Sequence, residues 1–579
     1  LIVYLLDDFY RELEPIGRLD IVGDLSKRAL NYYDALPPEL RTKDTDRNRA
    51  LALVRQGAVA RNLARSDEGE KALTEALRIL EALREGGDKQ EITAVGYALG
   101  LTFQAKIKGD RGKNAESMAL AQKAPEVLEP LAKAPGSSVT VRRTYAYVNL
   151  YLGFGQLRTN QPELAVKTLE ASREAYRSID DLKLTDLSAA TGYAESTAWQ
   201  MGALLDLQRF AEVRERGEEG IRIASEVLAR SPGHKLALRA LALTRSTMAD
   251  LEANVLNTRK AAMDSLASAR DWENYLRLDP GDSIGWNNLG ASGIRTADSL
   301  MDLGRESEAL TQYRAILAIE TKAKGKFQAF SHGGLAYAAS NIAAIQVQRG
   351  EMREAQASLA EARRLANITA QAYRAGSWDR ITAEEFPRIL EAYVGEAAGD
   401  YSVAREKMLA VATRLQSFKT TSALEKRQEA ETLERLNRDL ARWSFLLKDF
   451  AATEAYSRQS IDFRKREPAR SPRDATYSSE APILLATALA RQGRLVDARQ
   501  QLDPVLKLHR ELRSRGSDNL VQHVLMAGAL YAAALASPAD APARLAEAAA
   551  IIDAFPAEMK RRRTVSAVRE LIAQEMKRR

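Results

Sequence analysis

The sequence predicts an all-α protein, built as a solenoid of antiparallel helix pairs that follow one another along the chain. Two observations lead to this prediction. Apolar residues recur three and four positions apart, as on the buried face of a helix, and strand-like alternation is absent. A helix-stopping residue followed five positions later by a small residue also recurs about every 48 residues, which indicates one supersecondary unit per repeat.

The stretch from Leu276 to Ala309 is the clearest copy of this unit. Pro280 and Gly281 end one helix, because proline lacks a backbone donor and glycine permits the turn. A new helix is expected from Ser283. The residues predicted to be buried are Trp286, Leu289, Gly293, Ala297 and Leu300 on this helix, and Ala309, Tyr313 and Ile316 on the next. The short gap at Gly304 leaves the two helices antiparallel and adjacent.

The same punctuation can be followed along the chain. The pairs of helix stop and small residue are Gly112 with Ser117, Asn160 with Ala165, Gly304 with Ala309, Gly350 with Ala355, Gly399 with Ala404 and Gly493 with Ala498. Weaker copies are Asp67 with Ala72, Gln208 with Val213, Leu256 with Ala261 and Lys448 with Thr453. A period of about 48 residues predicts about twelve pairs, with helices of about 20 residues and small residues where helix backbones approach.

The central stretch resembles the tetratricopeptide repeat (TPR) family. Pro280, Trp286, Leu289 and Gly290 stand at the intervals of that family's proline, tryptophan and leucine-glycine pattern. The resemblance implies a right-handed superhelix that binds proteins or peptides. Gly293 stands where the family prefers tyrosine, and the next turn comes seven residues late, which lengthens the helices by two turns.

The segment from Leu5 to Pro37 carries a second resemblance. Residues 13–20 (LEPIGRLD) and 29–33 (ALNYY) are similar to the start of TPR regions in bacterial signalling and defence proteins, such as TIR proteins, STAND NTPases and serine/threonine kinases. The resemblance implies an effector domain upstream of residue 1. The first residue is leucine, so we expect that an upstream segment has been cut away or is not numbered.

The chain is expected to form one continuous array. It has 579 residues with no linker rich in glycine, serine or proline, and a stack of repeats needs none. We expect a helical start in residues 1–45, a TPR-like solenoid in residues 46–555, and a basic capping helix in residues 556–579.

The C-terminal segment holds most of the net charge. Residues 556–579 contain eight Lys/Arg and three Asp/Glu, a net charge of +5, so +2 of the total of +7 remains for the rest of the chain. A nearly neutral array disfavours nucleic-acid binding along its length. The amphipathic segment with Val565, Val568, Ile572 and Met576 on one face is either the helix that closes the last repeat or a contact to an anionic membrane or nucleic acid.

No set of catalytic residues can be assembled from the sequence. There is no cysteine, and the four histidines lack metal-ligand spacing. Phosphate-binding loops and nucleophile elbows are absent as well, so we predict neither enzyme activity nor a cofactor or metal. No apolar run approaches the roughly 20 residues of a membrane span, and no signal peptide opens the chain, so we expect a cytoplasmic protein.

Three local features carry further expectations. Gly153 and Gly155 lie inside a predicted helix and indicate close helix packing rather than a phosphate loop. A capping-box pattern at residues 382–385 predicts the start of a helix. The segments 466–474 and 513–518 are expected to be exposed loops, because proline, serine, glycine and charged residues gather there.

Partner-binding residues are predicted by alignment with the repeat. The resemblance implies a groove lined by the first helix of each pair, chiefly at the second, fifth, sixth and ninth positions of the repeat. Aligning Gly153 with the family's glycine puts Tyr147, Tyr151 and Phe154 at the second, sixth and ninth of these positions, on one helical face. The alternative is that these aromatic residues belong to the core between repeats.

Two asparagines are predicted to make polar contacts with the same partner. The alignment places Asn288 at the sixth position through Gly290, and Asn341 there through Gly350. An asparagine amide can both donate to and accept from a peptide backbone.

Two functions remain open at this point. In the first, the chain is the sensor or scaffold region of a larger bacterial signalling or defence protein, which binds a protein or peptide and regulates the upstream effector. In the second, it is a stand-alone oligomeric scaffold whose basic C-terminus contacts a membrane or nucleic acid.

Overall fold

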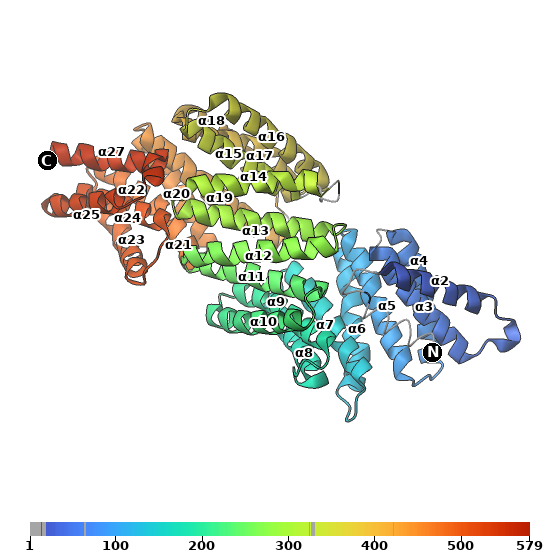
Figure 1. Ribbon diagram of the computed structural model, residues 1–579. Helices are drawn as coiled ribbons and strands as arrows, with labels where there is room; N and C mark the ends of the chain where they lie inside the picture. The colour runs from blue at the N-terminus through green and yellow to red at the C-terminus, as the bar shows by residue number, and fades with distance from the viewer. Residues whose placement is uncertain (1–12, 14–18, 63–64, 324, 326–330, 421) are drawn as a thin grey trace. The chain divides into compact units, whose positions relative to one another are not determined.

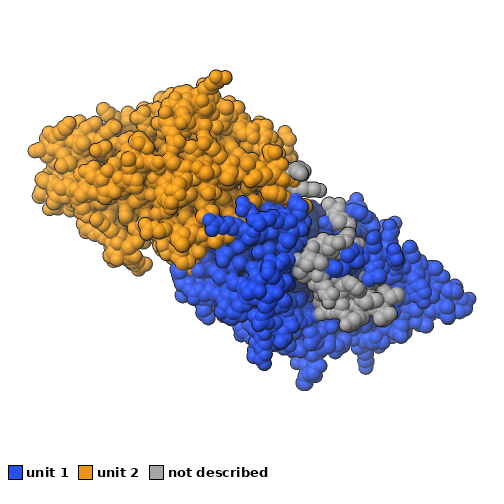
Figure 2. All heavy atoms as spheres, viewed as in Figure 1, with its two compact units in different colours: residues 1–248, 270–280 blue, residues 249–269, 281–579 orange. Residues whose placement is uncertain are grey.

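The computed structural model describes residues 13, 19–62, 65–323, 325, 331–420 and 422–579. Over these residues every regular element is a helix (Figure 1), and the predicted all-α, TPR-like solenoid is confirmed. The chain divides into two compact units, coloured in Figure 2. Unit 1 comprises residues 1–248 and 270–280, and unit 2 comprises residues 249–269 and 281–579. None of the described helices combines the length and apolar character needed to cross a membrane.

Unit 1 contains four complete helix pairs among its described residues, preceded by one helix and a short 3₁₀ turn. The elements are α2 (Leu19–Asp34), η2 (Pro38–Leu40), α3 (Lys43–Asn62), α4 (Ser66–Glu85), α5 (Glu91–Asp110), α6 (Asn114–Ala132), α7 (Val139–Arg158), α8 (Pro162–Asp180), α9 (Leu187–Asp206) and α10 (Phe210–Arg230). Two further helices, α11 (Lys235–Asn254) and α12 (Thr258–Leu278), contribute residues to both units.

Unit 2 continues the same alternation, and Figure 1 shows α13 to α18 as a row of neighbouring helices. The first elements are α13 (Ser283–Asp302), α14 (Glu306–Lys322), α15 (His332–Gln348), α16 (Met352–Ala372), α17 (Trp378–Ala398), α18 (Tyr401–Gln416), α19 (Ala423–Leu446) and α20 (Phe450–Arg466). The remaining elements are α21 (Pro472–Ser478), α22 (Glu480–Arg491), α23 (Leu495–Ser514), α24 (Leu520–Ala536), η4 (Pro538–Asp540), α25 (Ala541–Asp553), α26 (Ala557–Arg561) and α27 (Arg563–Arg578).

The turns inside the pairs follow the predicted period. Nine of the ten predicted helix stops have a left-handed backbone, with φ between 58° and 84°. They are Gly112, Asn160, Gln208, Leu256, Gly304, Gly350, Gly399, Lys448 and Gly493. The small residue five positions after each of them is buried, including the fully buried Ala165 and Ala404. The tenth position was wrong: α4 begins at Ser66, so Asp67 lies inside the first turn of the helix.

Two glycines allow the helices around α7 to pack closely. A Cβ atom on Gly153 would lie 2.4 Å from Cγ of Leu169 on α8, and one on Gly155 would lie 2.7 Å from Sδ of Met118 on α6. Real Cβ atoms do not approach other atoms this closely. The prediction that this glycine pair serves helix packing is confirmed.

Two local predictions were wrong. The helix α17 starts at Trp378 and is capped by Ser377, whose hydroxyl accepts from the backbone N of Arg380 at 3.2 Å. Thr382 therefore lies inside this helix, and its hydroxyl donates to the Trp378 carbonyl instead of capping. The expected exposure of the segment 513–518 holds for residues 513–516, but the prediction of a free loop was wrong, because Arg513 and Ser514 belong to α23 and Asp518 binds the start of α12.

The first helices of successive pairs form an inner layer in unit 1. The helices α3, α5, α7 and α9 pack against one another from pair to pair, in addition to their own partners. Among the described residues, α4, α6, α8 and α10 do not pack against one another to the same extent. A stack that is tighter on one side must curve toward that side. The first helices therefore line the concave side of unit 1.

Unit 2 closes on itself through residues that are far apart in sequence. The carboxylate of Asp518, in the loop after α23, accepts from the backbone N of Thr258 at 2.6 Å and of Arg259 at 3.0 Å. These are the first two residues of α12, whose N–H groups have no partner within the helix. The adjacent Asn519 donates to Thr258 Oγ1 at 3.3 Å and to Asp302 Oδ2 at 3.1 Å. We call this set of contacts the closing contact.

A second set of bonds supports the closing contact at α14. The hydroxyl of Ser307 donates to Glu558 Oε1 at 2.7 Å, across 251 positions of sequence. A Cβ atom on Gly304 would lie 3.0 Å from Cδ1 of Leu520 and 3.2 Å from Cβ of Met559. The helices α24 and α26 therefore pack directly against the turn between α13 and α14.

The glycine contacts yield a matched pair of variants in unit 1. We expect Gly153→Ala to destabilise the protein by about 1 to 3 kcal/mol, because the added methyl group overlaps Leu169. Gly202→Ala is the control, since the nearest atom to its Cβ, Cδ1 of Leu157, lies 3.9 Å away. That variant should gain up to about 1 kcal/mol from helix propensity. Urea denaturation followed by circular dichroism measures both, and equal midpoints for the two variants would contradict the packing described here.

The closing contact yields a second prediction. Asp518→Ala should lower the stability of unit 2 by about 0.5 to 2 kcal/mol, the usual cost of removing an N-terminal cap. The measurement is hydrogen exchange, which should rise in the first turn of α12 although the mutation lies about 260 positions away. Asp503→Ala, at an exposed site on α23, is the control. Unchanged exchange in α12 would mean that unit 2 is not closed in solution.

Candidate functional site

An array of aromatic rings crosses the inner layer of unit 1 from α5 to α9. Phe103 on α5 lies 6.1 Å from Tyr147 on α7, measured between ring centroids. Along α7, Tyr151 and Phe154 are 6.4 Å apart, and Phe154 lies 4.6 Å from Trp199 on α9. We call these five rings the aromatic strip. It connects three successive repeats.

Two cations lie on the faces of these rings. Nζ of Lys106 on α5 is 4.7 Å from the ring centre of Tyr147 and 5.1 Å from that of Tyr151. The same ammonium donates to the Tyr147 hydroxyl at 2.6 Å. The Arg158 guanidinium lies 5.8 Å from the ring centre of Phe154. Cation–π contacts of this kind orient the rings and leave positive charge beside an apolar surface.

A third cation lies near the two tyrosines from the side of α3. Nε of Arg61 pairs with Asp110 at 2.7 Å. Burial by itself would lower the pKa of Arg61, but the hydrogen bond and charge of Asp110 raise it above its usual value. Arg61 therefore stays positively charged next to Tyr147 and Tyr151, and basic side chains surround the aromatic strip.

The structure places the three predicted aromatic residues together on α7. Tyr147, Tyr151 and Phe154 are all partly buried. Tyr147 packs against the hydrophobic core of the preceding repeats, and Tyr151 against a smaller cluster that contains Leu152. One side of each ring thus belongs to the packing between repeats, while the remainder is accessible. Their role in partner binding stays a prediction.

Sequence reasoning missed three members of this site: Phe103, Lys106 and Trp199. The repeat period contains the signal that would have found two of them. Phe103, Tyr151 and Trp199 are each 48 positions apart, so they occupy the same position in three successive repeats. Equivalent positions of stacked repeats lie side by side. An aromatic residue at one position in three consecutive units therefore predicts a continuous row of rings, in which Phe103 is buried and Tyr151 and Trp199 are partly exposed.

The two predicted asparagines lie in unit 2, on adjacent helices. Asn288 on α13 donates through Nδ2 to the Ile284 carbonyl at 2.9 Å, and Asn341 on α15 donates to the Tyr337 carbonyl at the same distance. Both bonds are within the residue's own helix. The structure does not bring these side chains into the aromatic strip, whose residues all belong to unit 1.

Unit 2 holds a cluster of acidic and phenolic side chains at the end of α13, of which Tyr313 is buried and the others are partly buried. Oδ1 of Asp298 accepts from the hydroxyls of Tyr313 at 2.7 Å and Tyr337 at 3.2 Å. One turn later, Oδ2 of Asp302 accepts from the hydroxyl of Tyr477 at 3.0 Å, in addition to its bond from Asn519. Burial is the main cause that raises the pKa of Asp302, while the charge of Arg473 lowers it.

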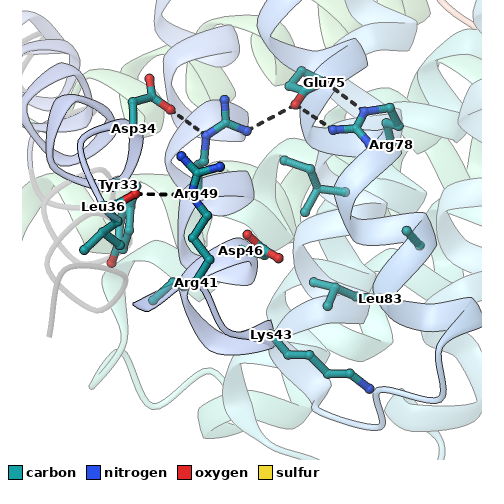
Figure 3. Close-up of a pocket in the computed structure, with 13 residues that line it drawn as sticks. Tyr33, Asp34, Leu36, Arg41, Lys43, Asp46, Arg49, Glu75, Arg78 and Leu83 are labelled. Atoms are coloured by element: carbon teal, nitrogen blue, oxygen red, sulfur yellow. Dashed lines mark hydrogen bonds and ion pairs between the residues drawn. The ribbon is translucent and has the colours of Figure 1, made fainter. Parts of the chain in front are cut away.

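A hollow at the start of unit 1 is lined by charged groups (Figure 3). Its volume is about 440 Å³. Nε of Arg49 donates to Asp34 at 2.7 Å and its Nη1 donates to Oε1 of Glu75 at 3.1 Å. Arg78 donates to the same Glu75 oxygen at 2.8 Å and to Oε2 at 3.0 Å. The Asp46 carboxylate lies near the middle of the view and has no ion-pair partner within bonding distance among the described residues. This carboxylate disfavours an anionic ligand.

The C-terminal helix α27 uses its apolar face for packing inside unit 2. Val565 and Ile572 are buried, and Val568 packs against the same core cluster as α24 and α25. Glu575 pairs with Arg491 on α22 at 3.1 Å and with Arg579 at 3.1 Å. Met576, the fourth residue of the predicted apolar stripe, is 48% exposed. Little of that stripe is left for a membrane.

Few groups of side chains among the described residues could bind a metal ion or catalyse a reaction. No group of three or more His, Asp or Glu side chains there could hold a metal ion. The ring of His509, for example, is buried against Ser479 at 2.8 Å, and burial is the main cause that lowers its pKa to about 4.

No protein-family model and no curated protein matches this sequence. Solved helical structures are similar at low sequence identity. A Rap protein complexed with competence and sporulation factor is 12% identical over 80% of this chain and 98% of its own, with a TM-score of 0.40. A monomeric mutant of IFIT1 with Gppp-AAAA is 13% identical over 88% and 94%, with a TM-score of 0.38. Yeast Tom70 is 12% identical over 91% and 96%, with a TM-score of 0.36. Similarities this weak carry no argument about function.

The acidic cluster gives unit 2 a specific pH dependence. Burial, with the charge of Asp302 adding to it, raises the pKa of Asp298 to about 6 from 3.8, although the Tyr313 hydroxyl partly offsets this. The folded protein therefore takes up a proton at a higher pH than the unfolded chain. The stability contributed by this site should rise as pH falls from about 6 toward 4, and be lost as pH rises through 6.

The comparison of wild type with Asp298→Asn isolates this contribution. As the pH is lowered from about 7 to about 5, the melting temperature of wild type should rise relative to that of the variant. Asp503→Asn, at an exposed position on α23, serves as the control and should follow wild type at every pH. A difference between wild type and Asp298→Asn that is independent of pH would contradict the assignment.

Proposed function

We propose that this chain is a scaffold that binds a protein or peptide partner through the aromatic strip on the inner side of unit 1. The observation that carries the proposal is the set of partly exposed rings of Tyr151, Phe154 and Trp199 with the cations Lys106 and Arg158 on their faces. Rigid aromatic groups next to arginine and lysine are typical of the residues that dominate binding energy at protein interfaces.

The charge around the strip indicates what kind of partner it takes. Lys106, Arg158 and Arg61 surround the rings, so the strip lies in a region of positive charge. An apolar or aromatic side chain with a neighbouring carboxylate would complement both the rings and the positive charge around them. The partner is therefore proposed to be a polypeptide segment with apolar anchors and acidic neighbours. Asn288 and Asn341 of unit 2 are proposed as polar contacts of the same partner.

The larger context is a second part of the proposal. The resemblance of residues 5–37 to TPR regions of bacterial signalling and defence proteins supports an effector domain encoded upstream, which the bound partner would regulate in the cytoplasm. Much of that segment lies outside the described residues. We also propose the boundaries given above, with residues 46–555 as the array and residues 556–579 as its cap. The burial of Val565 and Ile572 supports a capping role over the alternative of a membrane- or nucleic-acid-binding tail.

Selection of peptides tests the binding site although the natural partner is unidentified. A displayed library of random peptides is panned on the full chain, and the recovered sequences are synthesised and titrated. We expect apolar and acidic residues to be enriched, and Phe154→Ala and Tyr151→Ala each to weaken binding by about tenfold or more while the melting curve changes little. Asn288→Ala measures the contribution of unit 2.

The matched control is Tyr32→Ala, because Tyr32 is an aromatic residue of unit 1 that is 58% exposed and lies outside the strip. It should bind every selected peptide as wild type does. Equal binding by the Phe154, Tyr151 and Tyr32 variants would rule out the aromatic strip as the site. If Tyr151→Ala instead unfolds the protein, the ring belongs to the core, and the alternative stated from the sequence holds.

A further inference from the structure

A second hollow, in unit 2, is lined mainly by charged side chains. It has a volume of about 500 Å³, within the range of sites that hold small ligands. The walls come from α19, the end of α20, and α21 with the loop before it. The charged residues that line it are Arg435, Arg438, Arg464, Arg473, Glu431, Glu434 and Asp474.

The carboxylates of this hollow are already bound. Glu434 pairs with Arg438 at 3.1 Å and with Arg464 at 3.2 Å. Asp474 binds both Nη1 and Nη2 of Arg464 at 3.0 Å. Glu431 pairs with Arg427, which lies outside the lining, at 3.0 Å. The acidic groups therefore neutralise two of the four arginines and leave the other two.

Arg435 and Arg473 retain donors for a ligand. Arg435 is exposed on α19, and in the described part of the chain no carboxylate lies within ion-pair distance of its guanidinium. Arg473 has one carboxylate partner there, Asp302, with a single N–O distance of 3.4 Å. A guanidinium has five N–H donors, so most of those of Arg473 stay available. The Tyr477 hydroxyl, which also lines the hollow, binds the same Asp302 oxygen.

This arrangement connects the hollow to the closing contact. Arg473 and Tyr477 belong to the wall of the hollow and also hold Asp302. The same Asp302 oxygen accepts from Asn519, next to the Asp518 that caps α12. An anion that binds the free donors of Arg473 attracts the whole guanidinium, so it competes with Asp302 for the position and the charge of this group. Asp302 would then lose the opposite charge that compensates its burial.

We propose that this hollow is a binding site for a small multivalent anion that carries phosphate or carboxylate groups. Arg435 and Arg473 bind the anion through charge-assisted hydrogen bonds, the geometry for which the arginine fork is suited. Binding draws Arg473 away from Asp302 and loosens the closing contact of unit 2. The proposal is independent of the aromatic strip, whose residues lie in unit 1.

Calorimetric titration of the full chain at low ionic strength tests the site with two separate probes, pyrophosphate and citrate. Saturable binding of pyrophosphate alone would show that the site takes phosphate groups, and binding of citrate alone would show that it takes carboxylate groups. Binding of both would show that the site recognises negative charge without a preference between the two groups. Arg435→Gln should weaken binding by about tenfold or more, because an exposed arginine is removed with two charge-assisted bonds. Arg353→Gln is the control, an exposed arginine on α16 outside the hollow, and should bind as wild type does.

The competition with Asp302 has its own readouts. Asp302→Asn removes the competing charge and should tighten binding, whereas Arg473→Gln should weaken it. In wild type, saturating anion should raise hydrogen exchange in the first turn of α12, which Asp518 caps, and this measurement needs no variant. Failure of both probes to bind, or equal loss in Arg435→Gln and Arg353→Gln, would overturn the site. Binding with unchanged exchange in α12 would overturn the link to the closing contact.

Discussion

The structure depends on the tight turn inside each helix pair. One residue with positive φ ends the first helix, and the residue five positions later must be small enough for the backbones of the two helices to meet. The constraint is strong enough that leucine, lysine and glutamine occupy the left-handed position at Leu256, Lys448 and Gln208, with φ near 60°. This conformation costs a non-glycine residue on the order of 1 kcal/mol or more. Packing of the pair outweighs that cost.

A constant turn fixes the spacing of the repeats, and the spacing decides which side chains meet. In unit 1 the first helices stack on each other, so positions 48 residues apart become neighbours. The rings of Phe103, Tyr151 and Trp199 arise in this way, and Tyr147 and Phe154 join them at one-turn spacings along α7. A surface that runs across several repeats is thus produced from one position in the unit. This is the feature on which the proposed partner binding rests.

Electrostatics organise unit 2 differently. Asp302 is the last residue of α13, where the partial negative charge of the helix end already opposes a carboxylate. Its burial is tolerable only because Arg473, Tyr477 and Asn519 supply a charge and two hydrogen-bond donors from segments 171 to 217 positions away. The need to satisfy one buried carboxylate therefore holds distant helices together. Because Arg473 supplies the charge, a ligand that binds Arg473 would also affect the closing contact of unit 2.

The fold class, the 48-residue period, nine turn residues and most of the buried face of α13 follow from the sequence, because each depends on residues within a single helix pair. Trp286 on that face was predicted to be buried and is partly exposed. Such local requirements repeat in every unit and leave a periodic signal, and only the turn near Asp67 was misplaced by it. The aromatic residues of α7 were found for the same reason. Trp199 and Phe103 required the recognition that equal positions of different units become neighbours.

The closing contact, the charged hollow and the division into two units depend on contacts that occur once in the chain. Asp518 lies in a segment whose composition indicates an exposed loop, yet it caps a helix about 260 positions earlier. No periodic pattern accompanies such a pairing, since neither residue has an equivalent in other repeats. Which segments meet depends on how the stack of helix pairs curves. That curvature is the sum of small differences in packing between successive pairs, and composition and spacing do not encode these differences.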